Sequence, residues 1–105
     1  MPHSAARARV TTETFTWRGI RCSVTHTRNH VNEGWSRLYF RVESQGPPVP
    51  ITPTRTLIHD LDEDVVIAAG GTVPFMIAWL DRDALNASYA KALAAWKQFD
   101  LFGKP

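Results

Sequence analysis

Hydrophobic and polar residues alternate over much of the first half of the chain. The alternation runs through residues 13–17 and again through residues 20–25, with Arg18-Gly19 between the two stretches. Alternation with a period of two is typical of a half-buried β-strand, and a short link that ends in glycine is typical of a hairpin turn. Residues 35–44 resume the alternation after a loop-like stretch. The pattern therefore predicts three antiparallel strands, the first two forming a hairpin.

A proline-rich stretch follows the third predicted strand. The segment QGPPVPITPTR contains four of the seven prolines of the chain. Proline cannot donate a backbone hydrogen bond, so this segment is expected to be an extended surface connector and not a central strand. Residues 54–59 then return as a short edge strand.

The second half of the chain changes to helical spacing. Residues 62–64 are acidic and precede an apolar run that ends in Gly70-Gly71, which is typical of a short helix. Thr72 is a candidate cap for a second helix that reaches about Asp81, with proline in its first turn. A third, alanine-rich helix is expected from Asp83, which is its candidate cap.

These elements predict an α+β domain with a small antiparallel sheet of three to four strands, followed by two to three helices packed on one face. Residues 1–11 lack periodicity and are expected to form a loose basic arm, and residues 12–97 the single domain. The apolar stripe of the last helix ends at Phe99, and Leu101 would project to the opposite side. Residues 98–105 are therefore expected to form an extended tail.

Composition narrows the class of protein. The chain has 105 residues, of which 44% are hydrophobic and 21% charged, a composition typical of one globular domain and not of a disordered chain. A net charge of +2 does not by itself indicate a nucleic-acid or membrane partner. The single cysteine suits a reducing compartment, and neither a secretory signal nor a membrane-length apolar run is recognisable. We expect a cytoplasmic protein with no membrane partner.

The residues before the C-terminus carry a motif. The segment Gln98-Phe99-Asp100-Leu101-Phe102 resembles the pentapeptide with which bacterial replication and repair proteins bind the DNA sliding clamp, usually Gln-Leu-(Ser/Asp)-Leu-Phe. It departs from that form only at its second position, Phe99. The resemblance implies that an extended peptide docks into the pocket of the clamp. Gln98 would then hydrogen-bond at the pocket mouth, Leu101 and Phe102 would fill its apolar floor, and Asp100 would link them.

A structural role for the same residues remains open. Trp96, Phe99, Leu101 and Phe102 could instead fold back as a hydrophobic lid on the domain. The two interpretations differ in whether Leu101 and Phe102 are exposed in the folded monomer.

A basic and aromatic patch is a second candidate binding site. It would bind phosphates and stacked bases, and it consists of Arg18, Arg21, Arg37, Tyr39 and Arg41. Arginine and tyrosine are also ordinary on the exposed face of an antiparallel sheet, and Glu43 interrupts the patch. The sequence thus predicts at most a weak contact with DNA.

Metal binding and catalysis find less support. Cys22, His26 and His30 are spaced four apart, and His59-Asp60 follows later, so a zinc site is conceivable. Cys22 is better explained as a small buried hydrophobe. Phosphate-binding loops, nucleophile elbows and zinc-protease helices are not recognisable. Met76, Trp79 and Leu80 are interpreted as core, and we expect a non-enzyme that uses no metal or other cofactor.

Longer stretches, FTWRGIRCSVTH, VPITPTRT and PFMIAWLDRDA, resemble small uncharacterised proteins of bacterial plasmids and other mobile elements. Two functions are compatible with such a context. The first is an adaptor or modulator that engages the sliding clamp through residues 98–102, in replication or maintenance of the element. The second is a binder or inhibitor of a host defence complex that acts through its folded surface, with the tail structural. The sequence does not decide between them, nor does it indicate the oligomeric state.

Overall fold

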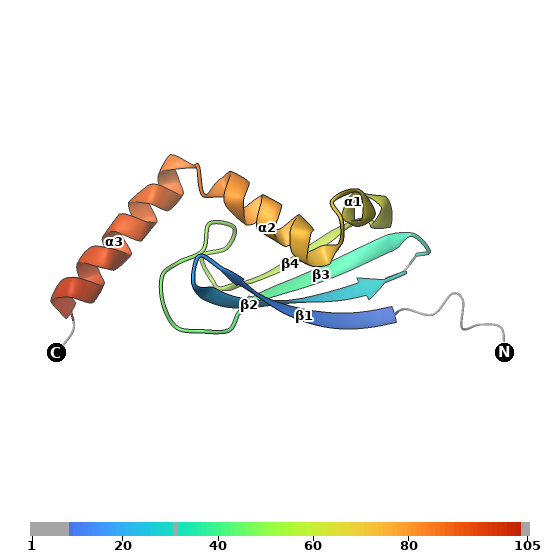
Figure 1. The fold of residues 1–105 in the computed structure, drawn as a ribbon, viewed down its shortest axis with the longest axis horizontal. Helices are drawn as coiled ribbons and strands as arrows, with labels where there is room; N and C mark the ends of the chain where they lie inside the picture. The colour runs from blue at the N-terminus through green and yellow to red at the C-terminus, as the bar shows by residue number, and fades with distance from the viewer. Residues whose placement is uncertain (1–8, 31, 104–105) are drawn as a thin grey trace.

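The computed structural model describes residues 9–30 and 32–103, and side chains only as far as Phe99. Its centre is a four-stranded antiparallel sheet with the strand order β1-β2-β3-β4 (Figure 1). The strands are β1 (Arg9–Trp17), β2 (Ile20–Arg28), β3 (Trp35–Val42) and β4 (Thr56–Asp62). Three helices follow in the chain: α1 (Glu63–Ala68), α2 (Thr72–Asp83) and α3 (Ala87–Gly103). The predicted α+β fold is confirmed.

The first two strands form the predicted hairpin. Trp17 pairs with Ile20 across the link, and both residues between them have positive φ, 49° for Arg18 and 81° for Gly19. Two-residue hairpin loops favour this left-handed geometry because its twist matches that of the strands. Gly19 adopts it without a steric penalty.

One face of the sheet forms the core. Cys22 pairs with Val42, Val24 with Phe40, and His26 with Leu38, and directly opposed residues share a face. Helices α1 and α2 lie over this face (Figure 1), and α2 contributes Met76 and Leu80, which are 1% and 0% exposed. The interpretation of Met76 and Leu80 as core residues is confirmed.

The proline-rich connector leads from β3 to the edge strand β4. Arg55 holds it in place by donating from its guanidinium to the carbonyl oxygens of Ser44, Gly46 and Pro47. Val42 N also donates to Arg55 O at 2.9 Å. Several backbone carbonyls of the proline-rich connector therefore accept hydrogen bonds from an arginine side chain, and not from the backbone of a neighbouring strand.

The N-terminal boundary differs from the expectation. Strand β1 begins at Arg9, which pairs with Arg28 of β2, so residues 9–11 belong to the sheet and not to a loose arm. The side chains of β1 are exposed from Arg9 to Thr14. Backbone pairing holds this part of the strand without burying either face, which is why no hydrophobic alternation marks it in the sequence. The remainder of the predicted arm, residues 1–8, lies outside the described residues.

Helix α3 leaves the domain. In Figure 1 it runs away from the end of α2 and stands apart from the sheet, beyond the connector between β3 and β4. The radius of gyration is 16.3 Å, against about 13 Å for a compact domain of this size. In the described part of the chain, no helix is both long and apolar enough to cross a membrane.

Candidate functional site

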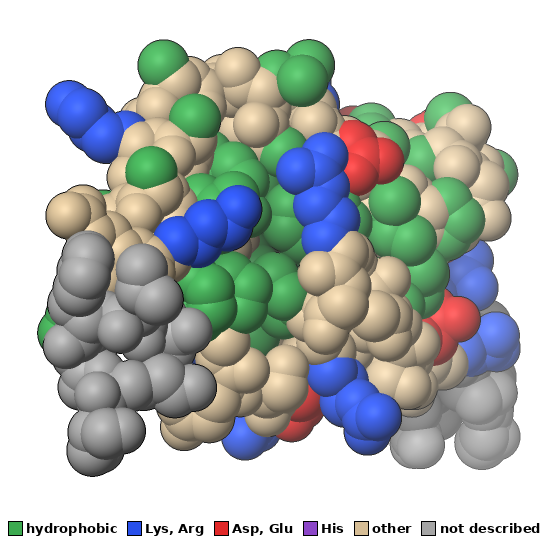
Figure 2. Space-filling view, turned by 60° about the vertical axis from the view of Figure 1, so that its left-hand side comes forward, with side chains coloured by type: hydrophobic (Ala, Val, Ile, Leu, Met, Phe, Trp, Pro, Cys, Tyr) green, Lys and Arg blue, Asp and Glu red, His purple; other side chains and the backbone are tan. Residues whose placement is uncertain are grey.

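Tyr89 anchors helix α3 to the domain. It is 7% exposed, its ring lies 6.2 Å from that of Trp17, and its hydroxyl donates to Pro48 O at 3.1 Å. Leu93, one turn later, is partly buried against the core. Figure 2 turns this end of the molecule toward the viewer and shows hydrophobic side chains gathered in the middle of the face, with Lys and Arg side chains lying across them.

Beyond this anchor the helix becomes exposed. Lys97, Gln98 and Phe99 are all exposed, and Phe99 reaches 73%. The side chains of the remaining motif residues, Asp100, Leu101 and Phe102, lie outside the described ones. Within the described side chains, the end of α3 therefore carries a large aromatic ring that the domain does not use.

The predicted extended tail is wrong for the backbone of residues 98–103, which continues the helix to Gly103. The expectation rested on the apolar stripe, which assumed that the last helix buries one face along its whole length. The helix instead projects from the domain, so the direction of Leu101 does not decide where the helix stops. Alanine, leucine, lysine and glutamine favour helix, and the chain offers no helix breaker before glycine. Residues 104–105 lie outside the described part.

The open face of the sheet carries most of the predicted basic patch. Thr25 pairs with Tyr39 and Thr27 with Arg37, so Arg21, Arg37, Tyr39 and Arg41 share the face opposite the helices. Arg18 does not join them. Its guanidinium carbon lies 4.7 Å from the ring centre of Trp17, which faces α2 and donates to Asp81 Oδ1 at 2.8 Å.

Carboxylates neutralise part of this patch. Arg37 donates to both carboxylate oxygens of Asp60, at 2.7 and 2.9 Å, and this hydrogen-bonded guanidinium lowers the pKa of Asp60 below its ordinary value. Arg41 Nε lies 3.8 Å from Glu43 Oε2. Because Arg37 and Arg41 already have carboxylate partners, the patch offers less attraction to phosphates than its composition indicates.

The candidate zinc ligands Cys22 and His26 lie in the core, where His26 is already hydrogen-bonded to other residues. Cys22 and His26 share the inner face of β2, as predicted, but both ring nitrogens of His26 are engaged, Nε2 with Ser36 Oγ and Nδ1 with Thr72 Oγ1, each at 3.0 Å. Among the described residues, no group of three His, Cys, Asp or Glu side chains is placed to hold a metal ion.

Cys22 is inert in this environment. Its side chain is 0% exposed, and burial raises the pKa of the thiol from 9.0 to about 11. Only the thiolate is a nucleophile. We therefore expect Cys22 to react with a disulfide reagent at pH 8 at least ~100-fold more slowly in the folded protein than in denaturant. Reaction should accelerate with rising pH, and equal rates in both states would contradict the burial.

The sequence did not reveal a buried polar network around His26. Ser36, which is 0% exposed, hydrogen-bonds both His26 and Glu63, and Glu63 Oε2 pairs with Arg28 Nε at 3.0 Å. The network joins β2, β3, α1 and α2. Its signal in the sequence was two polar residues, His26 and Ser36, at positions where the alternation calls for apolar ones.

Thr72 completes this network, and substitutions at Thr72 test how much the network contributes to stability. Instead of capping α2, for which Gly71 is the N-cap residue, Thr72 pairs its hydroxyl with His26 Nδ1. Thr72→Val should destabilise the fold by about 1–3 kcal/mol because it leaves a buried ring nitrogen without its partner. Thr72→Ser keeps the hydroxyl and should lose clearly less unfolding free energy. If chemical denaturation gives equal losses for the two variants, then packing of the Thr72 side chain, and not its hydrogen bond, determines the effect on stability.

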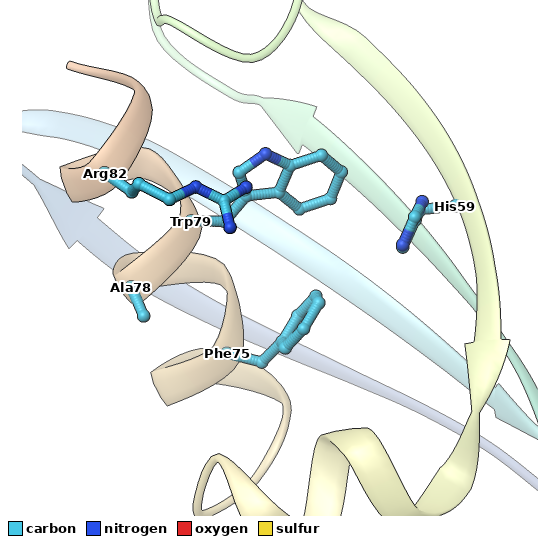
Figure 3. A pocket seen from close by; sticks show the side chains of 5 residues that line it. All are labelled: His59, Phe75, Ala78, Trp79 and Arg82. Carbon is cyan, nitrogen blue, oxygen red and sulfur yellow. The ribbon is translucent and has the colours of Figure 1, made fainter. Parts of the chain in front are cut away.

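A pocket of about 380 Å³ lies between β4 and α2. It is lined by His59, Phe75, Ala78, Trp79 and Arg82. Figure 3 shows His59 on one side and the α2 side chains on the other. Trp79, interpreted from sequence as core, is only partly buried and forms a wall of this pocket. The signal that could have revealed it is the spacing of positions 75, 78, 79 and 82, which form a second stripe along one helix.

The region between the proline-rich connector and α3 holds a smaller pocket, of about 260 Å³. Its lining combines prolines of the connector with Ser88, Tyr89 and Ala92 of α3. It marks the place where the helix is anchored, and of the motif residues with described side chains neither Gln98 nor Phe99 lines it.

The chain matches no known protein-family model, no curated protein and no solved structure in the comparisons made with them.

Proposed function

We propose that this protein is a non-catalytic adaptor or modulator that binds the bacterial DNA sliding clamp through residues 98–102, in replication or maintenance of a mobile element in the cytoplasm. The observation that carries the proposal is the projecting end of α3. It presents the motif with Phe99 largely exposed, beyond the part of the helix that Tyr89 anchors.

The helical state of the motif is compatible with binding in an extended form. The fragment that must unwind lies at a helix end, and Lys97, Gln98 and Phe99 are exposed. Short helical segments in water are marginally stable without tertiary packing. Unwinding the last turns therefore costs little free energy, and the domain with the first turns of α3 can remain unchanged.

The expected affinity follows from the side chains that would be buried. Leu101 and Phe102 each offer about 1.5–3 kcal/mol on burial, and ordering an unwound segment opposes this by about 2–5 kcal/mol. Hydrogen bonds of Gln98 and the peptide backbone add to the favourable side. These terms leave a net free energy of a few kcal/mol, so weak binding is expected, with a dissociation constant of micromolar to millimolar order.

A synthetic peptide of residues 95–105 tests the proposal without the domain. Titrated into purified bacterial sliding clamp, it should bind with an affinity close to that of the whole protein, because the domain contributes no contact to the pocket. A competing clamp-binding peptide from a replication protein should displace it. An inert peptide would refute the proposal, whatever the whole protein does.

A further inference from the structure

The pocket between β4 and α2 is built from three aromatic rings in a defined arrangement (Figure 3). The rings of His59 and Phe75 are close to parallel, with an interplanar angle of 17° and centroids 6.3 Å apart. Trp79 stands steeply to both, at 60° to His59 and 67° to Phe75. Three rings arranged in this way form an aromatic surface on which a flat ring can stack.

The three rings already pack against one another. Their centroids are 4.7, 6.0 and 6.3 Å apart, within the roughly 4.5–7 Å range of aromatic rings in contact. A flat ligand would therefore stack on the exposed side of this aromatic cluster, in the pocket of about 380 Å³, and not between two of its rings. His59 belongs to β4 and Phe75 and Trp79 to α2, so the cluster joins the edge strand to the helix.

Arg82 determines the charge of a suitable ligand. Of the described residues that line the pocket, Arg82 carries the formal charge, and its side chain is 73% exposed. Its Nε lies 3.3 Å from Asp83 Oδ1, while Asp83 Oδ2 accepts from Trp79 Nε1 at 3.2 Å. The neighbouring carboxylate thus orients both the arginine and the tryptophan. It also offsets part of the positive charge, as the partners of Arg37 and Arg41 do, but it contacts Nε, so the two terminal guanidinium nitrogens can still bind an anion.

We propose that this pocket binds a nucleotide, with the base stacked on the aromatic lining of His59, Phe75 and Trp79 and the phosphate on Arg82. Base stacking on aromatic side chains and phosphate pairing with arginine are the two contacts that the arrangement offers together. The volume of about 380 Å³ lies within the range of small-ligand sites, about 300–1,000 Å³. A cationic ligand, which aromatic boxes otherwise accept, is disfavoured by Arg82.

The same chemistry is present in a free mononucleotide and in single-stranded DNA. This site is distinct from the predicted basic patch, which lies on the opposite face of the sheet, and it does not depend on clamp binding.

The test is a titration of the isotope-labelled full chain, followed by the backbone amide resonances of β4 and α2. The probes are adenosine 5′-monophosphate, adenosine and a short single-stranded oligo(dA). The monophosphate should shift resonances of residues 57–61 and 75–82, with adenosine binding about tenfold or more weakly. If only the monophosphate shifts them, the ligand is a free nucleotide. If the oligonucleotide shifts the same resonances at lower concentration, the ligand is a single strand.

Arg82→Gln provides the matching variant, because its exposed side chain contributes little to folding. It should reduce the affinity for the monophosphate to that for adenosine, whereas Arg21→Gln, on the open face, should leave it unchanged. The proposal is overturned if none of the probes shifts these resonances. It is also overturned if Arg82→Gln has no effect, or if the shifts map to the open face around Arg37 and Arg41.

Discussion

The variant Leu101→Ala/Phe102→Ala should lose binding to the sliding clamp by about 100-fold or more while its fold and unfolding free energy stay those of the parent. Each truncation removes an apolar side chain that fills the clamp pocket, and about 1.4 kcal/mol corresponds to a factor of ten in affinity. Titration calorimetry or surface-immobilised clamp measures the binding, and chemical denaturation measures the stability.

Leu85→Ala is the matched control for this variant. Leu85 is 83% exposed in the link between α2 and α3, so the same kind of truncation is made outside the motif, and binding should not change. A double variant that still binds the clamp at parental strength would contradict the role of the motif. A double variant that unfolds much more easily would show that residues 101–102 belong to the hydrophobic lid considered from the sequence.

Phe40→Ala should destabilise the domain by about 3–5 kcal/mol. Phe40 is 1% exposed and stands at the centre of the sheet, paired with Val24 on β2 and Leu57 on β4. Its ring also lies 6.3 Å from that of Phe15. Since a domain of this size has a total stability of about 5–15 kcal/mol, the loss would bring it close to unfolding.

Phe99→Ala makes the same chemical change at the end of α3, and its effect on stability should stay within about 0.5 kcal/mol. The contrast between the two phenylalanines measures where the core ends. If Phe99→Ala cost as much as a core truncation, the end of α3 would be part of the hydrophobic core, and the folded-surface alternative would gain support. Urea denaturation of both variants under one set of conditions provides the comparison.

The sheet could be predicted because its strands bury one face. In β3 the exposed Tyr39 and Arg41 alternate with the buried Leu38, Phe40 and Val42, and this burial produces the alternation in the sequence. The first residues of β1 have no such signature, because they pair with β2 but bury neither face. For the same reason the end of α3 was misjudged. Where a helix projects beyond its anchored turns, as α3 does after Tyr89 and Leu93, it need not keep its apolar residues on one side.

The sites depend on contacts between elements, which a single sequence does not encode visibly. The pocket brings His59 of β4 against Phe75 and Trp79 of α2, and the buried network closes only when Thr72 reaches His26 across 46 positions. The basic patch could be placed on one face of the sheet, because alternate residues of a strand point to opposite faces. The pairing of Arg37 with Asp60 could not be predicted, because it depends on the register between β3 and β4.

Hydrogen exchange of the full chain, with and without purified sliding clamp, tests the central claim most directly. In the free protein the amides of residues 97–103 should exchange much faster than those of β2 and β3, because the segment ends a helix and its described side chains, Lys97, Gln98 and Phe99, are exposed. Saturating clamp should slow exchange in this segment alone and leave the sheet unchanged. Amides of 97–103 that are already as protected as the sheet in the free protein, or that do not respond to the clamp, would contradict the account.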